Sequence, residues 1–163
     1  MSFAIRSPSF THNATMPAEY TCEGKNISPP LIWSAPPAGT KSLVLIVDDP
    51  DAPDPAAPKM TWVHWVLYNL PPSAGSLSAG VTDVELPHGT LVGINDRKNL
   101  GYNGPCPPVG THRYFHKLYA VDIVLPDMRA PTKVDVLARI EGHVLAYSEV
   151  IGLYKLTQAP PQR

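Results

Sequence analysis

The sequence predicts a mainly β domain, a β-sandwich with one helix near its C-terminus. Three long segments, at residues 41–49, 60–70 and 112–124, are rich in apolar, aromatic and β-branched residues, which is typical of strands. Helical periodicity occurs only in one segment late in the chain. Because helices do not alternate with strands, a doubly wound parallel sheet is not expected.

The first half of the chain is predicted to form short extended segments followed by a long strand. Residues 3–10 could form a first strand, and residues 26–33 form an extended edge segment because a proline favours an extended conformation in the residue before it. In residues 41–49 the apolar run is not interrupted by polar residues, which predicts a strand covered on both faces. An acidic, proline-rich stretch at residues 48–55 ends it.

The other two long strands show a period of two. In residues 60–70 this places one set of side chains opposite another, namely Trp62, His64, Val66 and Tyr68 against Val63, Trp65 and Leu67. In residues 112–124 the two sets are His112, Tyr114, His116 and Leu118 against Arg113, Phe115, Lys117 and Tyr119. Residues 90–94 are a candidate for a short strand between them.

A helix of about fourteen residues is predicted to begin after Thr132, which is a suitable N-cap. Apolar residues then recur at three- and four-residue steps, at Val134, Leu137, Ile140, Val144 and Tyr147. A last strand could follow at residues 149–156, and the tail, residues 157–163, is expected to fray. The sequence therefore predicts a single domain over residues 1–163 with its core in about residues 11–156.

Composition argues against several classes of protein. The chain has 13 Lys and Arg against 14 Asp and Glu, so no basic surface predicts binding to nucleic acid. The N-terminus has no apolar signal core, and no apolar run approaches the ~18 residues of a membrane helix, so a cytoplasmic protein is expected. In that compartment Cys22 and Cys106 are expected to be free thiols. The sequence has no Cys-x-x-Cys pair, so a zinc site of that kind is not expected.

Several polar side chains that are candidates for binding or catalysis lie at or near the ends of the long strands. Asp49 and Asp51 end the first, His64 lies inside the second, and His112 and Tyr114 begin the third after a stiff loop rich in glycine and proline. They converge only if these strands are neighbours. If so, imidazole, phenol and amide donors surround a small cavity that suits phosphate, carboxylate or sulfate. A nearby Asp would hold each His in one tautomer or raise its charged fraction.

The same residues have other interpretations. Taken alone, His64 is as good a candidate for a satisfied buried histidine as for a ligand group, and His116 is better explained by packing or surface exposure. A metal site of His64, His112 and Asp49 is chemically allowed, but no ligand spacing supports it. The acidic stretch lacks the Gly and the Glu of a calcium-binding EF-hand. Cys106 lies between prolines with no helix N-terminus to activate it, so an unreactive thiol is expected.

Three motifs, in one order, resemble the signature of a known family. They are Asp49-Pro50-Asp51-Ala52-Pro53, Trp62-x-His64, and Gly104-Pro105-Cys106-Pro107-Pro108-x-Gly110-Thr111-His112-Arg113-Tyr114. With Cys22-Glu23-Gly24-Lys25-Asn26-x-Ser28-Pro29-Pro30-Leu31-x-Trp33, they are similar to the phosphatidylethanolamine-binding proteins, in particular to the bacterial and archaeal branch called Raf kinase inhibitor-like proteins. The resemblance implies an antiparallel β-sandwich and a cis peptide bond between Ala52 and Pro53.

The resemblance also implies which residues bind the ligand. Carried over position by position, they are Asp49, Asp51, Pro53, His64, Cys106, Pro107, Pro108, His112 and Tyr114. Asp51 and Arg113 are expected to support the site as a pair more than to contact the ligand. Because Cys106 stands where eukaryotic relatives have Gly, the mouth of the pocket is expected to differ from theirs. No cofactor and no metal ion is implied.

Residues and resemblance together favour a non-enzymatic binding protein. It would hold a small anion or a phosphorylated head group, regulate a protein kinase or a protease through the surrounding surface, and form a homodimer, as bacterial relatives often do. The alternative is a hydrolase or lyase with His64 or His112 as general base. Because the sequence shows no activated nucleophile and no metal-ligand set, acid–base groups alone would have to carry such an activity.

Overall fold

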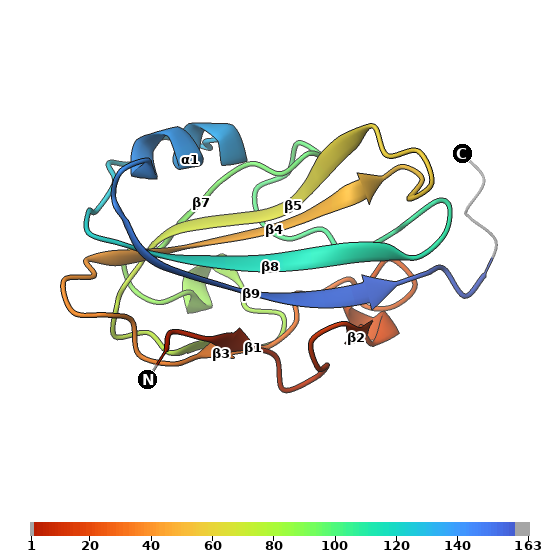
Figure 1. Ribbon diagram of the computed structural model, residues 1–163, viewed down its shortest axis with the longest axis horizontal. Coiled ribbons are helices and arrows are strands. Elements are labelled where there is room, and N and C mark those ends of the chain that lie inside the picture. The colour runs from red at the N-terminus through yellow and green to blue at the C-terminus, as the bar shows by residue number, and fades with distance from the viewer. Residues whose placement is uncertain (1, 159–163) are drawn as a thin grey trace.

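The long strands form a large sheet beside a smaller one. The computed structural model describes residues 2–158. The large sheet has the order β2 (Ala14–Thr15), β9 (Val144–Tyr154), β8 (His112–Val121), β4 (Ser42–Ala52), β5 (Met60–Leu70) and β7 (Leu91–Val92), as Figure 1 shows. The small sheet has the order β1 (Ile5–Arg6), β3 (Leu31–Trp33) and β6 (Ser76–Leu77). All strand pairs are antiparallel except β2 with β9. The prediction of a mainly β fold with a helix near the C-terminus is confirmed.

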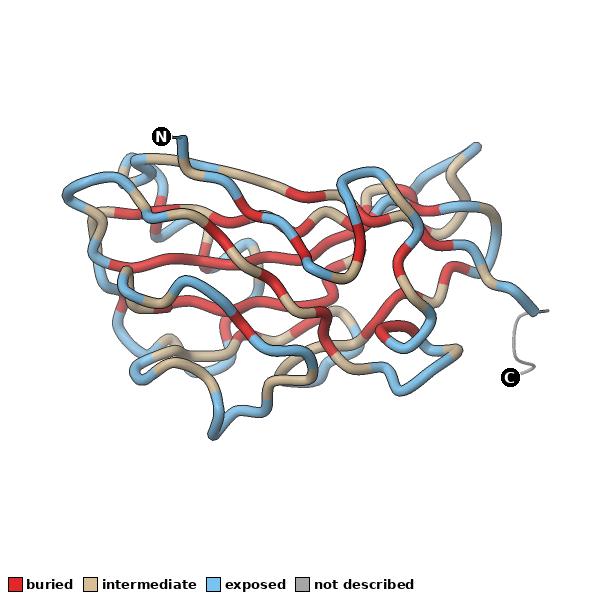
Figure 2. The backbone as a smooth tube through the Cα atoms, turned by 90° about the horizontal axis from the view of Figure 1, so that it is seen from below, coloured by how far each residue is buried: buried red, intermediate tan, exposed pale blue. Residues whose placement is uncertain are grey.

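Apolar side chains cover both faces of the large sheet. Leu43 and Leu45 of β4 lie in the core between the two sheets. Val44 and Ile46 of the same strand lie in a second core, under α1 (Lys133–Ile140). The uninterrupted apolar run of β4 is thus buried on both faces, as predicted, because each face has its own covering layer. Figure 2 shows the buried residues concentrated in the long central strands.

The alternation predicted for β5 is interrupted at His64. The register of β5 against β4 shifts there, so His64 is an extra residue that forms a β-bulge. Trp65 lies in the core between the sheets, whereas Val63 and Val66 lie in the core under α1. The prediction that Val66 shares a face with His64 is therefore wrong, because the bulge moves the later side chains to the opposite face. In β8 the predicted alternation is confirmed.

The helix is shorter than predicted. α1 has 8 residues, and its N-cap is Thr132, whose side chain accepts a backbone hydrogen bond from the first turn. The chain turns at Gly142, which has φ +83, and Val144 and Tyr147 lie in β9. The prediction of about fourteen residues is wrong because it counted the first side chains of a strand as the next turns of a helix. A glycine in the left-handed conformation is the local signal for the helix end.

Other predicted boundaries also change. The first strand is only β1, and the candidate at residues 90–94 is β7. The start of the tail is held in place, because the backbone N–H groups of Thr157 and Gln158 donate to the Glu23 carboxylate at 2.9 and 3.1 Å. The rest of the predicted frayed tail, residues 159–163, lies outside the described residues. Within residues 2–158, none of the helices has the length and apolar character needed to cross a membrane.

Candidate functional site

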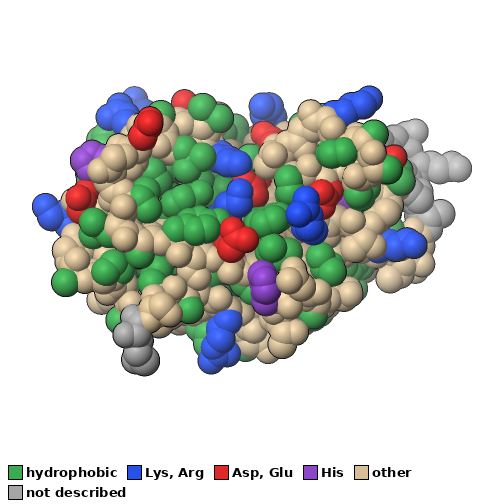
Figure 3. Space-filling model, viewed as in Figure 1, with side chains coloured by type: hydrophobic (Ala, Val, Ile, Leu, Met, Phe, Trp, Pro, Cys, Tyr) green, Lys and Arg blue, Asp and Glu red, His purple; other side chains and the backbone are tan. Residues whose placement is uncertain are grey.

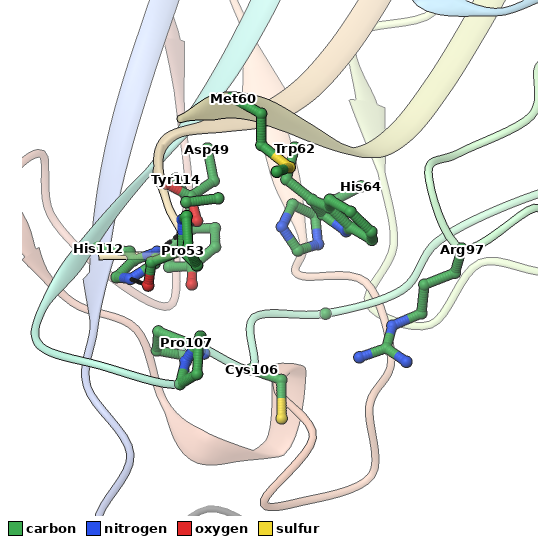
Figure 4. A pocket seen from close by; sticks show the side chains of 13 residues that line it. Asp49, Pro53, Met60, Trp62, His64, Arg97, Cys106, Pro107, His112 and Tyr114 are labelled. Atoms are coloured by element: carbon green, nitrogen blue, oxygen red, sulfur yellow. Dashed lines mark hydrogen bonds and ion pairs between the residues drawn. The ribbon is translucent and has the colours of Figure 1, made fainter. Parts of the chain in front are cut away.

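Three neighbouring strands place the candidate residues at one end of the large sheet. β8, β4 and β5 are adjacent and antiparallel, so the end of β4 lies beside the first residues of β5 and β8. Asp49 lies near the end of β4, His64 near the start of β5, and His112 is the first residue of β8. The convergence that the predicted pocket requires is therefore present, and Figure 4 shows these side chains around a common space.

A cavity of about 230 Å³ opens at this point. Its lining includes every predicted ligand residue except Asp51, namely Asp49, Pro53, His64, Cys106, Pro107, Pro108, His112 and Tyr114. The lining residues that the sequence did not single out as ligand contacts are Ala52, Met60, Trp62, Arg97 and Gly104. Trp62 was within reach, since it belongs to the Trp62-x-His64 motif. That these residues bind a ligand stays a prediction.

Asp49 and His112 form a buried ion pair behind the cavity. His112 Nδ1 lies 2.5 Å from Oδ2 of Asp49, and its Nε2 lies 2.9 Å from the carbonyl oxygen of Val109 and 3.1 Å from that of Pro53. Because both ring nitrogens face acceptors, we assign a proton to each, which makes the ring positively charged. Burial acts to lower the pKa of His112, but the hydrogen bond and charge of Asp49 outweigh it and raise that pKa.

The ring of His64, in contrast to that of His112, is neutral. Its Nδ1 lies 2.6 Å from the carbonyl oxygen of Asn103, so we assign its proton to Nδ1, and Nε2 carries a lone pair. Nε2 is buried and has no hydrogen-bond partner among residues 2–158. Burial lowers the pKa of His64 despite the opposing effects of Asn103 and Asp49, so the ring is neutral at pH 7. An unpaired buried acceptor on a cavity wall is a group that a ligand can satisfy.

Tyr114 supplies a hydroxyl donor beside the two histidines. Its ring stacks on His112 with centroids 6.3 Å apart and meets His64 edge-on at 5.3 Å. Burial holds the pKa of Tyr114 well above its ordinary value, so the phenol stays protonated. Within the described part of the chain its hydroxyl makes no hydrogen bond, which leaves it free for a ligand.

Asp51 supports the site from outside the cavity. The Arg113 guanidinium donates two hydrogen bonds to its carboxylate, at 3.0 and 2.9 Å, and the backbone N–H of Arg113 donates a third at 2.9 Å. The hydrogen bond from the guanidinium is the main cause that lowers the pKa of Asp51. The backbone N–H of Asp51 in turn donates to Asp49 at 2.7 Å. The expected pairing of Asp51 with Arg113 is thus observed, and it positions the Asp49 carboxylate.

A disulfide bond between Cys22 and Cys106 fixes the lip of the cavity. The prediction of two free thiols is therefore wrong. It depended on an assumed reducing compartment, and a sequence separation of 84 hid the proximity of the two cysteines. Two hydrogen bonds hold the same loop: Cys22 N donates to the Pro105 carbonyl at 3.1 Å, and Gly104 N donates to Oδ1 of Asn26 at 2.7 Å.

Arg97 contributes a positive charge at the mouth. It is exposed and lines the cavity, and Figure 4 shows its guanidinium on the side where Cys106 lies. Its backbone N–H donates to Oδ1 of Asn95 at 2.9 Å, within a tight turn. No strand or motif of the sequence marks this turn as part of the site. Among residues 2–158, no group of three or more His, Cys, Asp or Glu side chains could hold a metal ion.

A family model and several relatives match nearly the whole length of the chain. The family model described as phosphatidylethanolamine-binding protein matches residues 6–155. A UPF0098 protein of Methanothermobacter thermautotrophicus is 48% identical over 152 residues, which cover 93% of this chain and 97% of that protein. A UPF0098 protein of Chlamydia muridarum is 40% identical over 151 residues, with the same coverage of both chains.

Solved structures show the same fold. A phosphatidylethanolamine-binding protein homologue of Chlamydia trachomatis superposes with a TM-score of 0.87 at 38% identity, covering 95% of this chain and 98% of that one. YbcL of Escherichia coli gives a TM-score of 0.85 at 28% identity, covering 96% and 100%. The carboxypeptidase Y inhibitor, solved with its cognate proteinase, gives 0.58 at 17% identity, with 93% and 82% covered. This last likeness concerns the fold alone.

Proposed function

We propose that this chain, which belongs to the phosphatidylethanolamine-binding protein family, is a non-enzymatic binding protein. Its ligand is a small anion or a phosphorylated head group. The observation that carries the proposal is the pair of unpartnered groups on the cavity wall, the Tyr114 hydroxyl and the buried Nε2 of His64. They lie beside the buried His112–Asp49 ion pair, and Arg97 adds a positive charge at the mouth. A largely apolar cavity with a few free hydrogen-bonding groups and a positive charge at its mouth is suited to a small oxyanion.

Size and charge support the same ligand class. The cavity volume of about 230 Å³ is several times the share of about 30 Å³ that one water molecule takes in the liquid, so a phosphate or phosphoethanolamine group fits. Asp49 neutralises His112, and Asp51 neutralises Arg113. Arg97 is the lining residue whose positive charge is not offset by a salt bridge within residues 2–158, and it attracts an anion to the mouth.

Replacing the free hydroxyl tests the proposal. We expect weak binding of phosphate and of O-phosphoethanolamine to the unaltered protein, and a loss of about tenfold or more in Tyr114→Phe, because a hydrogen bond to a charged group is removed. Tyr119→Phe is the matched control, since Tyr119 is on the same strand but the opposite face, where it packs against Tyr147. Isothermal titration calorimetry measures all three. Equal affinity in Tyr114→Phe and in the unaltered protein would contradict the assignment.

The structure leaves fewer candidates for the general base of an enzyme than the sequence did. Both ring nitrogens of His112 are engaged, so His112 cannot accept a proton, and a general base would have to be Nε2 of His64. Turnover of esters or phosphoesters that is lost in His64→Gln would favour a hydrolase. We expect no turnover, because no nucleophile is hydrogen-bonded to this nitrogen within the described residues.

The wider biology is proposed from the family resemblance. A protein kinase or a protease is the proposed partner at the surface around the mouth, and inhibition assays on a carboxypeptidase and a kinase test it. A homodimer is proposed, with light scattering as its test. A cytoplasmic location stays a proposal that cell fractionation checks, and it has to account for the Cys22–Cys106 disulfide, since such bonds are rare in the cytosol outside hyperthermophiles.

A further inference from the structure

We propose that the cavity takes up its anion together with one proton, which is held between an oxygen of the anion and Nε2 of His64. The inference rests on the proposed function, because it states the protonation state in which that ligand is bound. The proton comes from solvent or from the anion itself, and no bond other than those to this proton is made or broken.

The need for a proton follows from the hydrogen bonds of His64. Nε2 is buried without a partner, and Nδ1 already donates to Asn103, so the neutral ring presents only a lone pair at Nε2. A fully deprotonated oxyanion also presents only lone pairs. The two groups repel each other when they meet in a site shielded from water, unless one proton lies between them.

The ring cannot avoid this conflict by rotating or by changing tautomer. The backbone N–H of Asn103 donates to the His64 carbonyl at 3.1 Å, while the Asn103 carbonyl accepts from the His64 ring at 2.6 Å. The Asn103 side chain is fixed as well, because its Oδ1 accepts from Asn95 at 2.8 Å and from Asn99 at 2.9 Å. Turning the ring would leave the Asn103 carbonyl without its donor. The acceptor at Nε2 is therefore a fixed property of the site.

The charged groups around His64 set when it takes the proton. Asp49 and Asp48 on β4 favour the protonated ring, and Arg97, in the turn before the loop at residues 101–110, disfavours it. On β8, the Tyr114 phenol is neutral, His112 is charged but paired with Asp49, and His116 is neutral above pH 5 because burial lowers its pKa to about 4. In the free protein burial dominates and the ring is neutral. An anion in the cavity adds the negative charge that makes the protonated ring favourable.

Two kinds of ligand satisfy the site. A phosphate monoester has a second pKa of about 6, so near that pH it brings its own O–H and donates it to Nε2. Sulfate brings no proton and has to draw one from solvent. The proposal therefore predicts that both bind, that sulfate binding takes up a proton, and that both bind more tightly in mild acid.

Sulfate titrations provide the test, because sulfate stays deprotonated throughout the useful pH range. We expect the association constant for sulfate to fall by close to tenfold for each unit of pH between about 6.5 and about 8.5. Calorimetry in Tris and in Bis-Tris, which contain no competing oxyanion, gives the number of protons taken up from the dependence of the heat on the buffer. We expect about one proton per sulfate.

Two variants assign the proton to one residue. His64→Gln retains a polar side chain that does not titrate, so the pH dependence and the proton uptake should be lost. His143→Gln is the matched control: His143 is half-exposed and pairs with Asp122 at 2.8 Å. It directly precedes Val144, which pairs with Val121 at the end of β8 opposite His112. The His143→Gln variant should keep both the pH dependence of sulfate binding and the proton uptake. If His64→Gln does not fold, the ¹⁵N chemical shift of Nε2 in the unaltered protein reports the same event on addition of sulfate.

The outcomes separate this inference from the proposed function. Sulfate binding without proton uptake, or uptake that persists in His64→Gln, would overturn the inference and leave the binding function standing. An Nε2 shift that does not move on binding would overturn it as well. If neither phosphate nor sulfate binds at any pH between about 5.5 and about 8.5, the proposed function fails together with the inference.

Discussion

His116 shows what a buried imidazole does away from the cavity. Its Nδ1 lies 3.0 Å from the Tyr114 carbonyl oxygen and 3.3 Å from that of Val150, and its ring packs against Phe10 with centroids 5.5 Å apart. Nε2 has no partner within residues 2–158. Burial lowers the pKa of His116 to about 4. The sequence left packing and surface exposure open for His116, and the structure shows that the side chain is buried and packed. The residue is a stability liability in acid.

Acid should therefore destabilise the protein through this residue. Between its folded pKa of about 4 and the unfolded value of about 6.5, the unfolded chain binds more protons than the folded one. The contribution of His116 is complete above about pH 6.5 and is lost as the pH falls toward 4. Urea unfolding at about pH 7 and about pH 4.5 should show that His116→Gln removes about 2–3 kcal/mol of the pH-dependent loss.

The comparison needs a histidine that is not buried. His88→Gln, at an exposed position, should lose stability with falling pH as the unaltered protein does, because this change leaves the buried His116 ring in place. Equal pH dependence in His116→Gln and in the unaltered protein would mean that the buried ring is already satisfied or solvated.

At the scale of elements, the loop at residues 101–110 has no regular secondary structure but is held at several points. The disulfide joins it to the segment before β3, the Tyr102 hydroxyl donates to the Tyr20 carbonyl at 2.8 Å, and Asn95 donates to the Gly101 carbonyl at 2.9 Å. A Cβ on Gly104 would lie 2.2 Å from the Tyr20 carbonyl oxygen, so only glycine permits this close approach. The lip of the cavity is thus positioned before any ligand arrives.

Removing the disulfide should destabilise the whole protein. Because Cys22 and Cys106 have a sequence separation of 84, the bond restricts a long loop of the unfolded chain. Cys22→Ala/Cys106→Ala should therefore lose about 2–4 kcal/mol of unfolding free energy. Urea unfolding measures the loss, and the unaltered protein under a dithiol reductant should approach the same value. Alkylation of both cysteines in the native, unreduced protein, detected by mass spectrometry, would show that the bond does not form.

The sequence predicted β4, β5 and β8 because long strands repeat a pattern often enough to be recognised. β1, β2 and β6 have 2 residues each, too few to show a period. The bulge at His64 and the helix end at Gly142 are single-residue events that periodicity cannot register. Cavity residues on strand ends were found, whereas Arg97 was missed because a local turn, held by Asn95, positions it. The disulfide was missed because the fold, and not the spacing, brings its cysteines together.

At the scale of the molecule, α1 is tied to the large sheet by charge as well as by packing. Asp48 is fully buried on the face of β4 that looks toward α1. Its Oδ2 lies 3.0 Å from Nζ of Lys117 on β8 and 2.5 Å from Nζ of Lys133, the first residue of α1. Figure 3 shows basic and acidic side chains together near the middle of this face, with hydrophobic side chains on both sides. One carboxylate thus links β4, β8 and the helix.

Removing the two lysines alone should lower the free energy of unfolding more than removing the lysines and Asp48 together. Lys117→Met/Lys133→Met leaves the Asp48 carboxylate buried without a counter-charge, and we expect a loss of about 3–5 kcal/mol of unfolding free energy. Adding Asp48→Leu removes the uncompensated charge and should restore most of it, because a buried ion cluster and an apolar cluster of similar size are often equally stable. Either lysine variant alone should lose less, since the other ammonium still compensates Asp48.

Urea unfolding of the four variants and of Lys59→Met, an exposed lysine that should be near neutral, decides between two roles for the cluster. If the triple variant is as stable as the unaltered protein, apolar packing alone is enough to hold α1 on the sheet. If it stays as unstable as the double variant, the directional bonds from Lys117 and Lys133 are needed to orient the helix. That result would also predict altered packing at Val136 and Ile140, which the same helix buries against the sheet.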